Sequence, residues 1–165
     1  MNINNVSLRP MTMQDSESYR ILRNKPEIRK WFYSNSVISA DEQRLWFENY
    51  LHKDNEIMFS IIYRNFFAGG GGIYHIDSIQ KSAEIGRIVV DKTVAVERGV
   101  GKNAILAASQ LAFQLGIKTL YANIYADNIA SQKAFKGAGF DLNFDWENNR
   151  CYAVKIQGEG AYGTD

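Results

Sequence analysis

The sequence predicts one mixed α/β domain, built on a single, mostly antiparallel sheet with helices on both faces. Three β-rich runs, Ile57–Tyr63, Phe67–Ile76 and Glu84–Val90, follow one another through short polar turns, as in an antiparallel meander. After the third run, helix and strand patterns alternate, which is typical of a sheet covered by helices. The 165 residues suffice for one domain, which we expect over residues 1–156, with a flexible glycine-rich tail over 157–165.

Helix signals dominate the segment before the three strands. Thr12 can cap a first helix, and Pro26 is tolerated in the first turn of a second. Ser39 and Glu42 form a capping box that starts a third. In order we expect strand Val6–Arg9, helix Met13–Arg23, a short helix Glu27–Tyr33, and a helix after Ser39 whose apolar face is Leu45, Trp46, Tyr50 and Leu51.

The second half reads as helix, strand, helix and hairpin. Gly116 stops a helix that begins near Lys102. Four glycines, Gly69–Gly72, interrupt the second β-rich run, and we expect a kinked strand that leaves room for a ligand, with a phosphate nest as the alternative. The remaining elements are strand Thr119–Tyr125, helix Asn128–Gly137 and a hairpin of Phe140–Trp146 with Cys151–Ile156.

Composition excludes several classes of protein. Nineteen basic and eighteen acidic residues leave a formal charge of +1, so the broad basic field that nucleic acid requires is missing. Cys151 is the single cysteine, which excludes an internal disulfide and, with two histidines distant in sequence, forms no metal-ligand cluster. We expect Cys151 to be a buried thiol. With no signal-peptide pattern and no membrane-length apolar run, we expect a cytoplasmic protein.

A glycine loop, Arg98–Lys102, precedes the helix that Gly116 stops. The first turn of a helix offers unpaired N–H groups and a positive dipole end, and glycine lets an anion approach the backbone. The loop therefore predicts a phosphate site. A Walker loop is excluded because Val96 and Asn103 stand where it needs glycine and Ser or Thr. The run Gly99–Ala104 fits a dinucleotide pattern, but the antiparallel strands upstream disfavour that fold.

Two motifs in this order resemble the Gcn5-related N-acetyltransferase (GNAT) family. Arg98-Gly99-Val100-Gly101 resembles the family's coenzyme-A loop, and the run from Asn128 to Phe140 resembles its second motif. The likeness extends from Leu8 to about Ile156. It implies a GNAT-like fold with a splayed parallel strand pair and acetyl-CoA as the cofactor. The cofactor-binding residues that it implies are Ile88, Val90, Arg98, Gly99, Val100, Gly101, Lys102, Asn128, Ser131 and Phe135.

Two positions depart from the family pattern. Val96 stands where Arg or Gln is usual, which removes one phosphate contact. Phe135 stands where a tyrosine usually acts as general acid. A free thiol has a pKa of about 8.5, so the leaving thiolate lies only roughly 2 kcal/mol from neutral pH and water can protonate it. The substitution therefore weakens the acid assignment without excluding the activity, and a non-catalytic coenzyme-A-binding domain remains an alternative.

The expected reaction is direct attack of a neutral primary amine on the thioester. Glu84, on the strand that leads to the thioester, is the candidate base, and His75 is the alternative. Neutralising a lysine-type amine at pH 7 costs about 4.6 kcal/mol, against about 1 kcal/mol for an α-amino group. The sequence thus favours an amine of low pKa.

The N-terminal helices are expected to bind the acceptor. Their sequence resembles the GNAT subgroup that acetylates amino groups of nucleotide-linked sugars, the pseudaminic acid pathway type. It also resembles acetyltransferases of ribosomal-protein N-termini, which is the second candidate. We expect a small-molecule amine as partner, with no nucleic acid and no membrane, and a homodimer as a possibility. The candidate substrate-binding residues are Arg23, Asn24, Arg29, Trp31 and Trp46.

Overall fold

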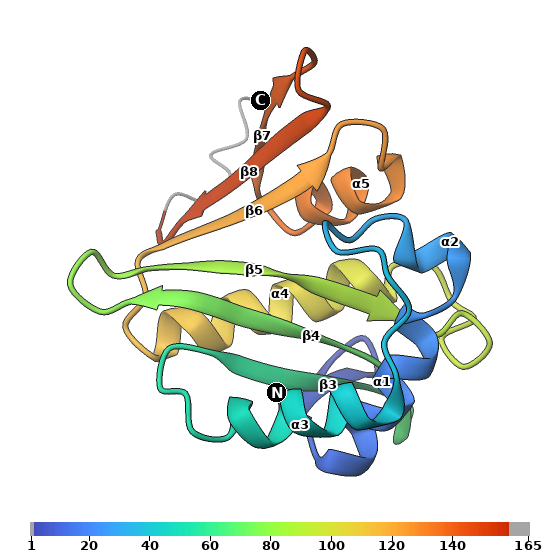
Figure 1. Cartoon of the computed structure of the whole chain (residues 1–165). Helices are drawn as coiled ribbons and strands as arrows, with labels where there is room; N and C mark the ends of the chain where they lie inside the picture. Colours follow the sequence, from blue (N-terminus) through green and yellow to red (C-terminus); the bar gives the residue numbers. More distant parts are fainter. Residues whose placement is uncertain (1, 159–165) are drawn as a thin grey trace.

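The protein, described from a computed structural model over residues 2–158, is built on one eight-stranded sheet (Figure 1). Part of the expected tail, residues 159–165, lies outside the described residues. The sheet order is β1-β2-β3-β4-β5-β6-β8-β7. The strands are β1 (Asn2–Ile3), β2 (Val6–Pro10), β3 (Ile57–Tyr63), β4 (Phe66–Asp77), β5 (Ser82–Val90), β6 (Thr119–Tyr125), β7 (Asp141–Asp145) and β8 (Arg150–Ile156).

All strand pairs are antiparallel except β5–β6. The predicted meander is therefore confirmed as β3–β4–β5, and the predicted C-terminal hairpin as β7–β8. The sequence analysis did not foresee β1, whose two residues pair with Val6 and Ser7. A strand of two residues carries no period for a pattern to reveal.

Helices cover both faces of the sheet, as predicted. On one face, α4 (Val100–Gln114) and α5 (Ile129–Gly137) enclose the larger core. On the other, α1 (Met13–Arg23) and α3 (Ala40–Tyr50) enclose a smaller core of Tyr19, Leu22, Phe47 and Met58 (Figure 1). The remaining helix is the short α2 (Pro26–Arg29).

Two local expectations were wrong. The helix after Pro26 ends at Arg29 rather than Tyr33. In α3, Leu45 and Leu51 are exposed, whereas Gln43 is buried and donates to Ser16 Oγ at 2.8 Å. A hydrogen bond supplied by α1 lets a polar residue occupy the face that hydrophobicity alone assigned to leucine.

The glycine run in β4 makes room for protein side chains rather than for a ligand. A Cβ at Gly71 would lie 2.5 Å from Ile88 Cδ1, and one at Gly70 would lie 2.7 Å from Met11 Cε. The four glycines are buried. The glycines therefore allow close packing on both faces of the sheet, Gly70 against the α1 side and Gly71 against the larger core, and the expected ligand space is absent there.

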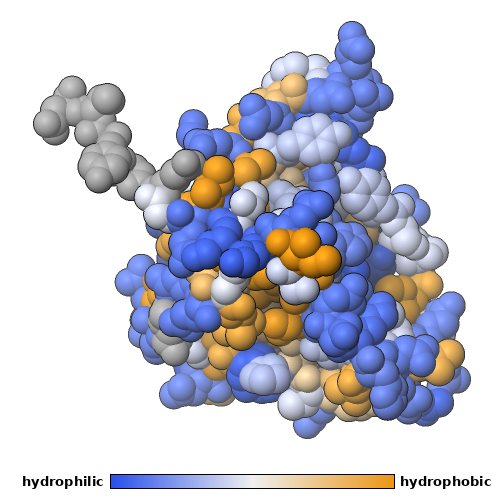
Figure 2. Space-filling model, turned by 90° about the vertical axis from the view of Figure 1, so that its left-hand side faces the viewer, coloured by the Kyte–Doolittle hydropathy of each residue, from blue (hydrophilic) through white to orange (hydrophobic). Residues whose placement is uncertain are grey.

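Within residues 2–158, no helix is both long and apolar enough to cross a membrane. Seen from the side of the β4–β5 turn, the surface is mostly hydrophilic with scattered hydrophobic areas (Figure 2). Cys151 is buried, as expected, and burial raises the pKa of its thiol.

Candidate active site

The sheet opens between its two parallel strands. Pairing of β5 with β6 covers only Ser82–Glu84 against Thr119–Tyr121, after which β5 continues to Val90 and β6 to Tyr125 without touching (Figure 1). We call the space between Ile85–Val90 and Ala122–Tyr125 the strand opening. Backbone N–H and C=O groups on its two edges have no partner strand, so an extended ligand that carries amide groups can pair with them.

The glycine loop lies beside the end of β5 and starts α4. Gly99 has φ +89°, a left-handed conformation that favours glycine, and it is the N-cap residue. A Cβ there would meet nothing closer than Lys102 Cε at 4.0 Å, so the loop is open toward a ligand. Val100, Gly101 and Lys102 form the first turn, whose N–H groups are available to an anion. Arg98 is exposed. These residues fit a diphosphate.

The second motif places its residues on the β6–α5 connection. Asn128 Oδ1 accepts the Ser131 backbone N–H at 3.2 Å, so this pair caps α5. Phe135 is only 3% exposed and packs edge-on against Phe140 with 5.1 Å between ring centroids. It belongs to the larger core and offers no proton donor. Contacts of Asn128, Ser131 and Phe135 with the cofactor stay predictions.

A β-bulge distorts β5 at the strand opening. Between the pairs Gly70–Val89 and Gly72–Gly86, β4 has one residue and β5 has two, Arg87 and Ile88. Arg87 adopts φ +55°, and its carbonyl accepts the Tyr19 hydroxyl at 2.8 Å. A bulge turns backbone groups out of the ladder. The predicted contacts of Ile88 and Val90 with the cofactor remain predictions at this distorted edge.

Glu84 and His75 meet at the closed end of the strand opening. His75 Nδ1 lies 2.9 Å from Glu84 Oε2. Asn123 Nδ2 donates to Glu84 Oε1 at 3.1 Å, and the Tyr74 hydroxyl donates to the same oxygen at 3.2 Å. The Glu84 side chain is 8% exposed, whereas that of His75 is 61% exposed. The two sequence candidates thus form one pair, buried at the carboxylate and open at the imidazole.

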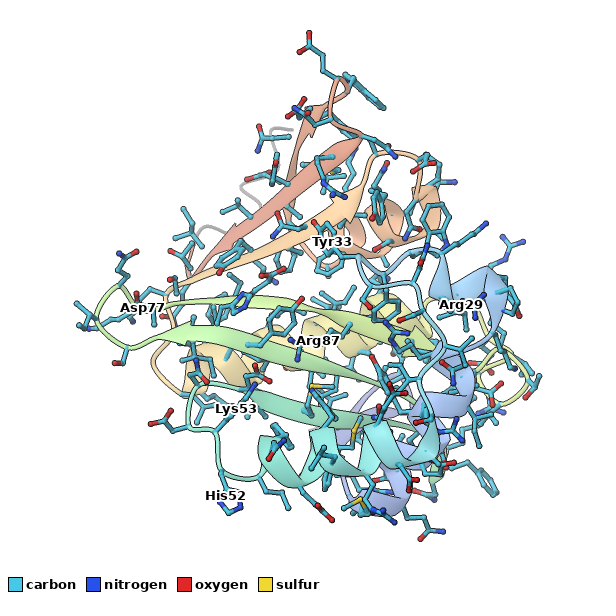
Figure 3. The ribbon with its side chains drawn as sticks, viewed as in Figure 1. Arg29, Tyr33, His52, Lys53, Asp77 and Arg87 are labelled. Carbon is cyan, nitrogen blue, oxygen red and sulfur yellow. The ribbon has the colours of Figure 1, made fainter. Side chains whose placement is uncertain are left out.

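Tyr74 supports this pair through its hydroxyl. Burial first, and then the nearby Glu84 charge, raise the pKa of Tyr74, so the phenol stays protonated and donates. The Arg87 guanidinium lies 4.0 Å above the Tyr74 ring and bonds Glu56 Oε2 at 3.3 Å. In Figure 3, Arg87 lies in front of β4 and β5. These contacts fix the orientation of the Tyr74 side chain.

The structure gives Arg23 and Asn24 structural contacts. Asn24 exchanges two hydrogen bonds with the Ile38 backbone, at 2.8 and 2.9 Å, and Arg23 donates to the carbonyls of Ser34 and Ser36. Both side chains therefore attach the loop 31–38 to the end of α1. Their predicted contact with substrate gains no support from this arrangement and stays a prediction.

The other three acceptor candidates lie in different surroundings. Trp46 stacks on Tyr50 at 5.7 Å and packs against the smaller core. Trp31, half-buried, lies with its ring centroid 6.4 Å from that of Tyr125, on the β6 edge of the strand opening. Arg29 is half-exposed at the outer edge of α2, whereas Tyr33 lies beside β6 (Figure 3). Of the five predicted residues, Trp31 is the one that contacts the strand opening.

Tyr74 and Asn123, the two side chains that donate to Glu84 Oε1, were not predicted from the sequence. The signal in the sequence was the alternation along β6, where Tyr121, Asn123 and Tyr125 are half-buried and the residues between them are buried. Such a strand has one face free for function. The polar residue Asn123 at the centre of that face was the sequence feature that could have indicated it.

The sheet opens between two parallel strands, beside the positive end of a helix, and an ionisable pair lies where it opens. These features fit an enzyme that binds an extended, phosphate-bearing cosubstrate. A profile described as "Acetyltransferase (GNAT) domain" matches residues 5–141. The chain therefore belongs to the GNAT acetyltransferase family. It is an acyltransferase, and acetyl-CoA is its cosubstrate.

Solved structures show the same fold. Spermidine N-acetyltransferase from Vibrio cholerae, in complex with CoA and spermine, superposes with a TM-score of 0.82 at 18% identity, covering 95% of this chain and 98% of that one. A domain from Methanocaldococcus jannaschii gives 0.77 at 22% identity, with 92% and 97% covered. AAC(6')-Ib with ribostamycin and coenzyme A gives 0.78 at 14%, with 93% and 94% covered. No curated protein matches by sequence.

Proposed function

We propose that the protein transfers the acetyl group of acetyl-CoA to a primary amine of a small molecule, by direct attack of the amine. The observation that supports this most is the Glu84–His75 pair at the closed end of the strand opening. A non-catalytic coenzyme-A-binding domain would have no need for a buried carboxylate with three donors beside an exposed imidazole. This argues for turnover.

The His75–Glu84 pair removes the proton from the acceptor ammonium. If Nδ1–H donates to Glu84, the Nε2 lone pair of His75 is free to accept the proton of the incoming ammonium, directly or through one water. Asn123 and Tyr74 keep the carboxylate in place for this tautomer. Glu84, named first from sequence as the base, is then the orienting group, and His75 is the base.

Acetyl-CoA supplies the acetyl group as a thioester. Backbone N–H groups of Gly99–Lys102 and the Lys102 ammonium are suited to binding its diphosphate. The bulge at Arg87–Ile88 offers backbone groups that can interact with the thioester carbonyl. Phe135 leaves the thiolate to water, which suffices for a leaving group of pKa about 8.5.

The acceptor subtype is the finer part of the proposal. A nucleotide-linked amino sugar remains the candidate from sequence, although of its five predicted residues only Trp31 lies at the strand opening, and Arg23, Asn24 and Trp46 contact protein. Polyamines and aminoglycosides, which appear in the names of the structural neighbours, are the comparison substrates. The cytoplasmic location and the homodimer expected from the sequence stay predictions.

A thiol-release assay tests the activity. The protein, acetyl-CoA and one amine are mixed, free coenzyme A is measured, and the acetylated product is identified by mass spectrometry. The panel contains a UDP-amino sugar, spermidine, ribostamycin and an N-terminal peptide. We expect turnover with a small-molecule amine; coenzyme-A binding by thermal shift with no turnover across the panel would leave the enzyme proposal without support.

A further inference from the structure

The side chain of Arg150 lies between two tyrosine rings, on the β6 side of the strand opening. The Arg150 guanidinium carbon is 4.4 Å from the Tyr33 ring centroid and 4.4 Å from that of Tyr125. Tyr33 comes from the loop 31–38, whereas Tyr125 and Arg150 are cross-strand partners on β6 and β8. The three residues therefore bring the loop 31–38 together with strands β6 and β8.

Arg150 has donors to spare. Its Nη1 is buried and has no hydrogen-bond partner among the described residues, and the side chain enters no ion pair with a carboxylate among residues 2–158. A buried N–H group left unpaired is costly, and an arginine fork matches the two oxygens of a carboxylate or phosphate. The tyrosine rings fix the plane of the guanidinium without satisfying its donors.

Arg150 shares a sheet face with the catalytic pair. Asn123, bonded to Glu84, and Tyr125 alternate with buried residues of β6, so both point to the same face, and Arg150 pairs with Tyr125. Two residues along a strand span roughly 7 Å. Tyr125, whose ring contacts the Arg150 guanidinium, thus lies one side-chain spacing beyond Asn123, the residue that donates to Glu84.

We infer that Arg150 binds an anionic group of the acceptor, so that the preferred substrate is a primary amine that also carries a carboxylate or phosphate. The amine lies at His75, and the anion lies between the rings of Tyr33 and Tyr125. Tyr33 is 63% exposed and can turn outward to admit the group to Nη1. This inference rests on the proposed acetyl transfer and narrows its substrate class away from polycations.

The test compares matched acceptors that differ by one anionic group. 6-Aminohexanoate against hexylamine tests the carboxylate, and glucosamine 6-phosphate against glucosamine tests the phosphate. For the unaltered protein we expect kcat/KM to favour the anionic member of at least one pair by about 10- to 100-fold, the range of a charge-assisted hydrogen bond. The pair with the larger ratio identifies the anion.

The variant Arg150→Met keeps the side-chain length and removes the donors. We expect it to bring the anionic-to-neutral ratio close to one, with Arg150→Lys in between because a lysine keeps the charge and loses the fork. Arg44→Met, on an exposed arginine of α3, should leave the ratio as it is. Melting temperatures show whether each variant is folded, and the ratio of the unaltered protein tests the inference even if Arg150→Met is not.

Equal kcat/KM for the two members of both pairs would overturn the inference, as would an anion preference that survives in folded Arg150→Met. Such results differ from a failure of the proposed function, in which no amine of the panel releases coenzyme A at all. A higher kcat/KM for hexylamine or spermidine than for every anionic acceptor would also overturn it, and a preference for spermidine in particular would indicate a polycation site.

Discussion

At the scale of single residues, the active site depends on how Glu84 is held. The carboxylate is buried at the last position where β5 and β6 still pair, and a buried charge is tolerated because Tyr74, His75 and Asn123 surround it with donors. His75 itself has φ +50° in an irregular part of β4, a conformation unusual outside glycine. Strain of this kind persists where the surrounding contacts enforce it, and here those contacts point the imidazole to Glu84.

If His75 is the base and Glu84 orients it, their variants will not be additive. We expect His75→Gln to lower kcat by about 100-fold, the usual range of general-base catalysis, and Glu84→Gln by at least about 10-fold. The double variant should be close to His75→Gln alone. KM for acetyl-CoA should stay within about twofold in all three, because neither residue lies on the glycine loop.

The matched control is His52→Gln, on an exposed histidine just after α3 and distant from Tyr33 in Figure 3, which should keep full activity. Losses that multiply in the double variant would mean that the two residues act separately.

At the scale of elements, Asp15 joins three of them. It sits in the first turn of α1, accepts the Ser60 hydroxyl of β3 at 2.9 Å and the Thr12 N–H at 3.0 Å, and pairs with Arg9 of β2. Burial raises its pKa, but the hydrogen bonds from Arg9, Thr12 and Ser60 together lower it to about 2, against an ordinary value of 3.8.

The sign of the stability effect follows from that depression. A folded-state pKa below the unfolded one stabilises the fold above about pH 4, and the contribution disappears as the pH falls from about 4 to about 2. The lowered pKa of Asp15 stabilises the folded protein by about 2 kcal/mol at neutral pH. We expect urea midpoints of the unaltered protein and Asp15→Asn to differ clearly at pH 7 and to converge near pH 2. A difference independent of pH would show that packing, and not charge, is responsible.

Elements with strong local signals were predictable from the sequence. Helix α1, strand β3 and strand β6 have the predicted limits, because Thr12, the β-branched runs and the flanking turns act within a few residues. The buried face of α3 was not predictable, since the partner of Gln43 is Ser16 on another helix. The prediction of ligand space at the glycine run of β4 was wrong for the same reason, because the residues that fill this space, Met11 and Ile88, come from other segments of the chain.

The glycine loop permits a test of backbone conformation against space. Gly99→Ala places a side chain at φ +89°, which costs about 1–2 kcal/mol and shifts the loop, so we expect KM for acetyl-CoA to rise about 10-fold. Gly101→Ala is the control: Gly101 has no left-handed φ, and its Cβ would meet only Val90 Cγ2, at 3.9 Å. It should leave KM within about twofold. Equal effects would show that bulk at the loop, and not the conformation of Gly99, decides affinity.

At the scale of the whole molecule, the candidate site forms where β5 and β6 separate and the loop 31–38 packs against β6. The enzyme class and its cosubstrate could be predicted, since the glycine loop and the second motif that indicate them are each contiguous in sequence; the residues expected to contact the cofactor stay predictions. The proposed acceptor side combines Tyr33, His75, Asn123 and Arg150, which are separated by long stretches of chain and come together through the folding of the sheet. No local pattern encodes such a meeting.

The loop 31–38 sets the width of the acceptor side, because it carries Trp31 and Tyr33 against Tyr125 while Asn24 fixes its other end at Ile38. Asn24→Ala removes both hydrogen bonds, and we expect a loss of stability of about 1–2 kcal/mol and a several-fold rise in the acceptor KM. KM for acetyl-CoA should not change, since the glycine loop lies on another connection. Asn35→Ala, on an exposed residue of the same loop, should change neither constant. A rise in both KM values in Asn24→Ala would instead mean that Asn24 supports the whole sheet, and the two sides of the strand opening would then not be independent.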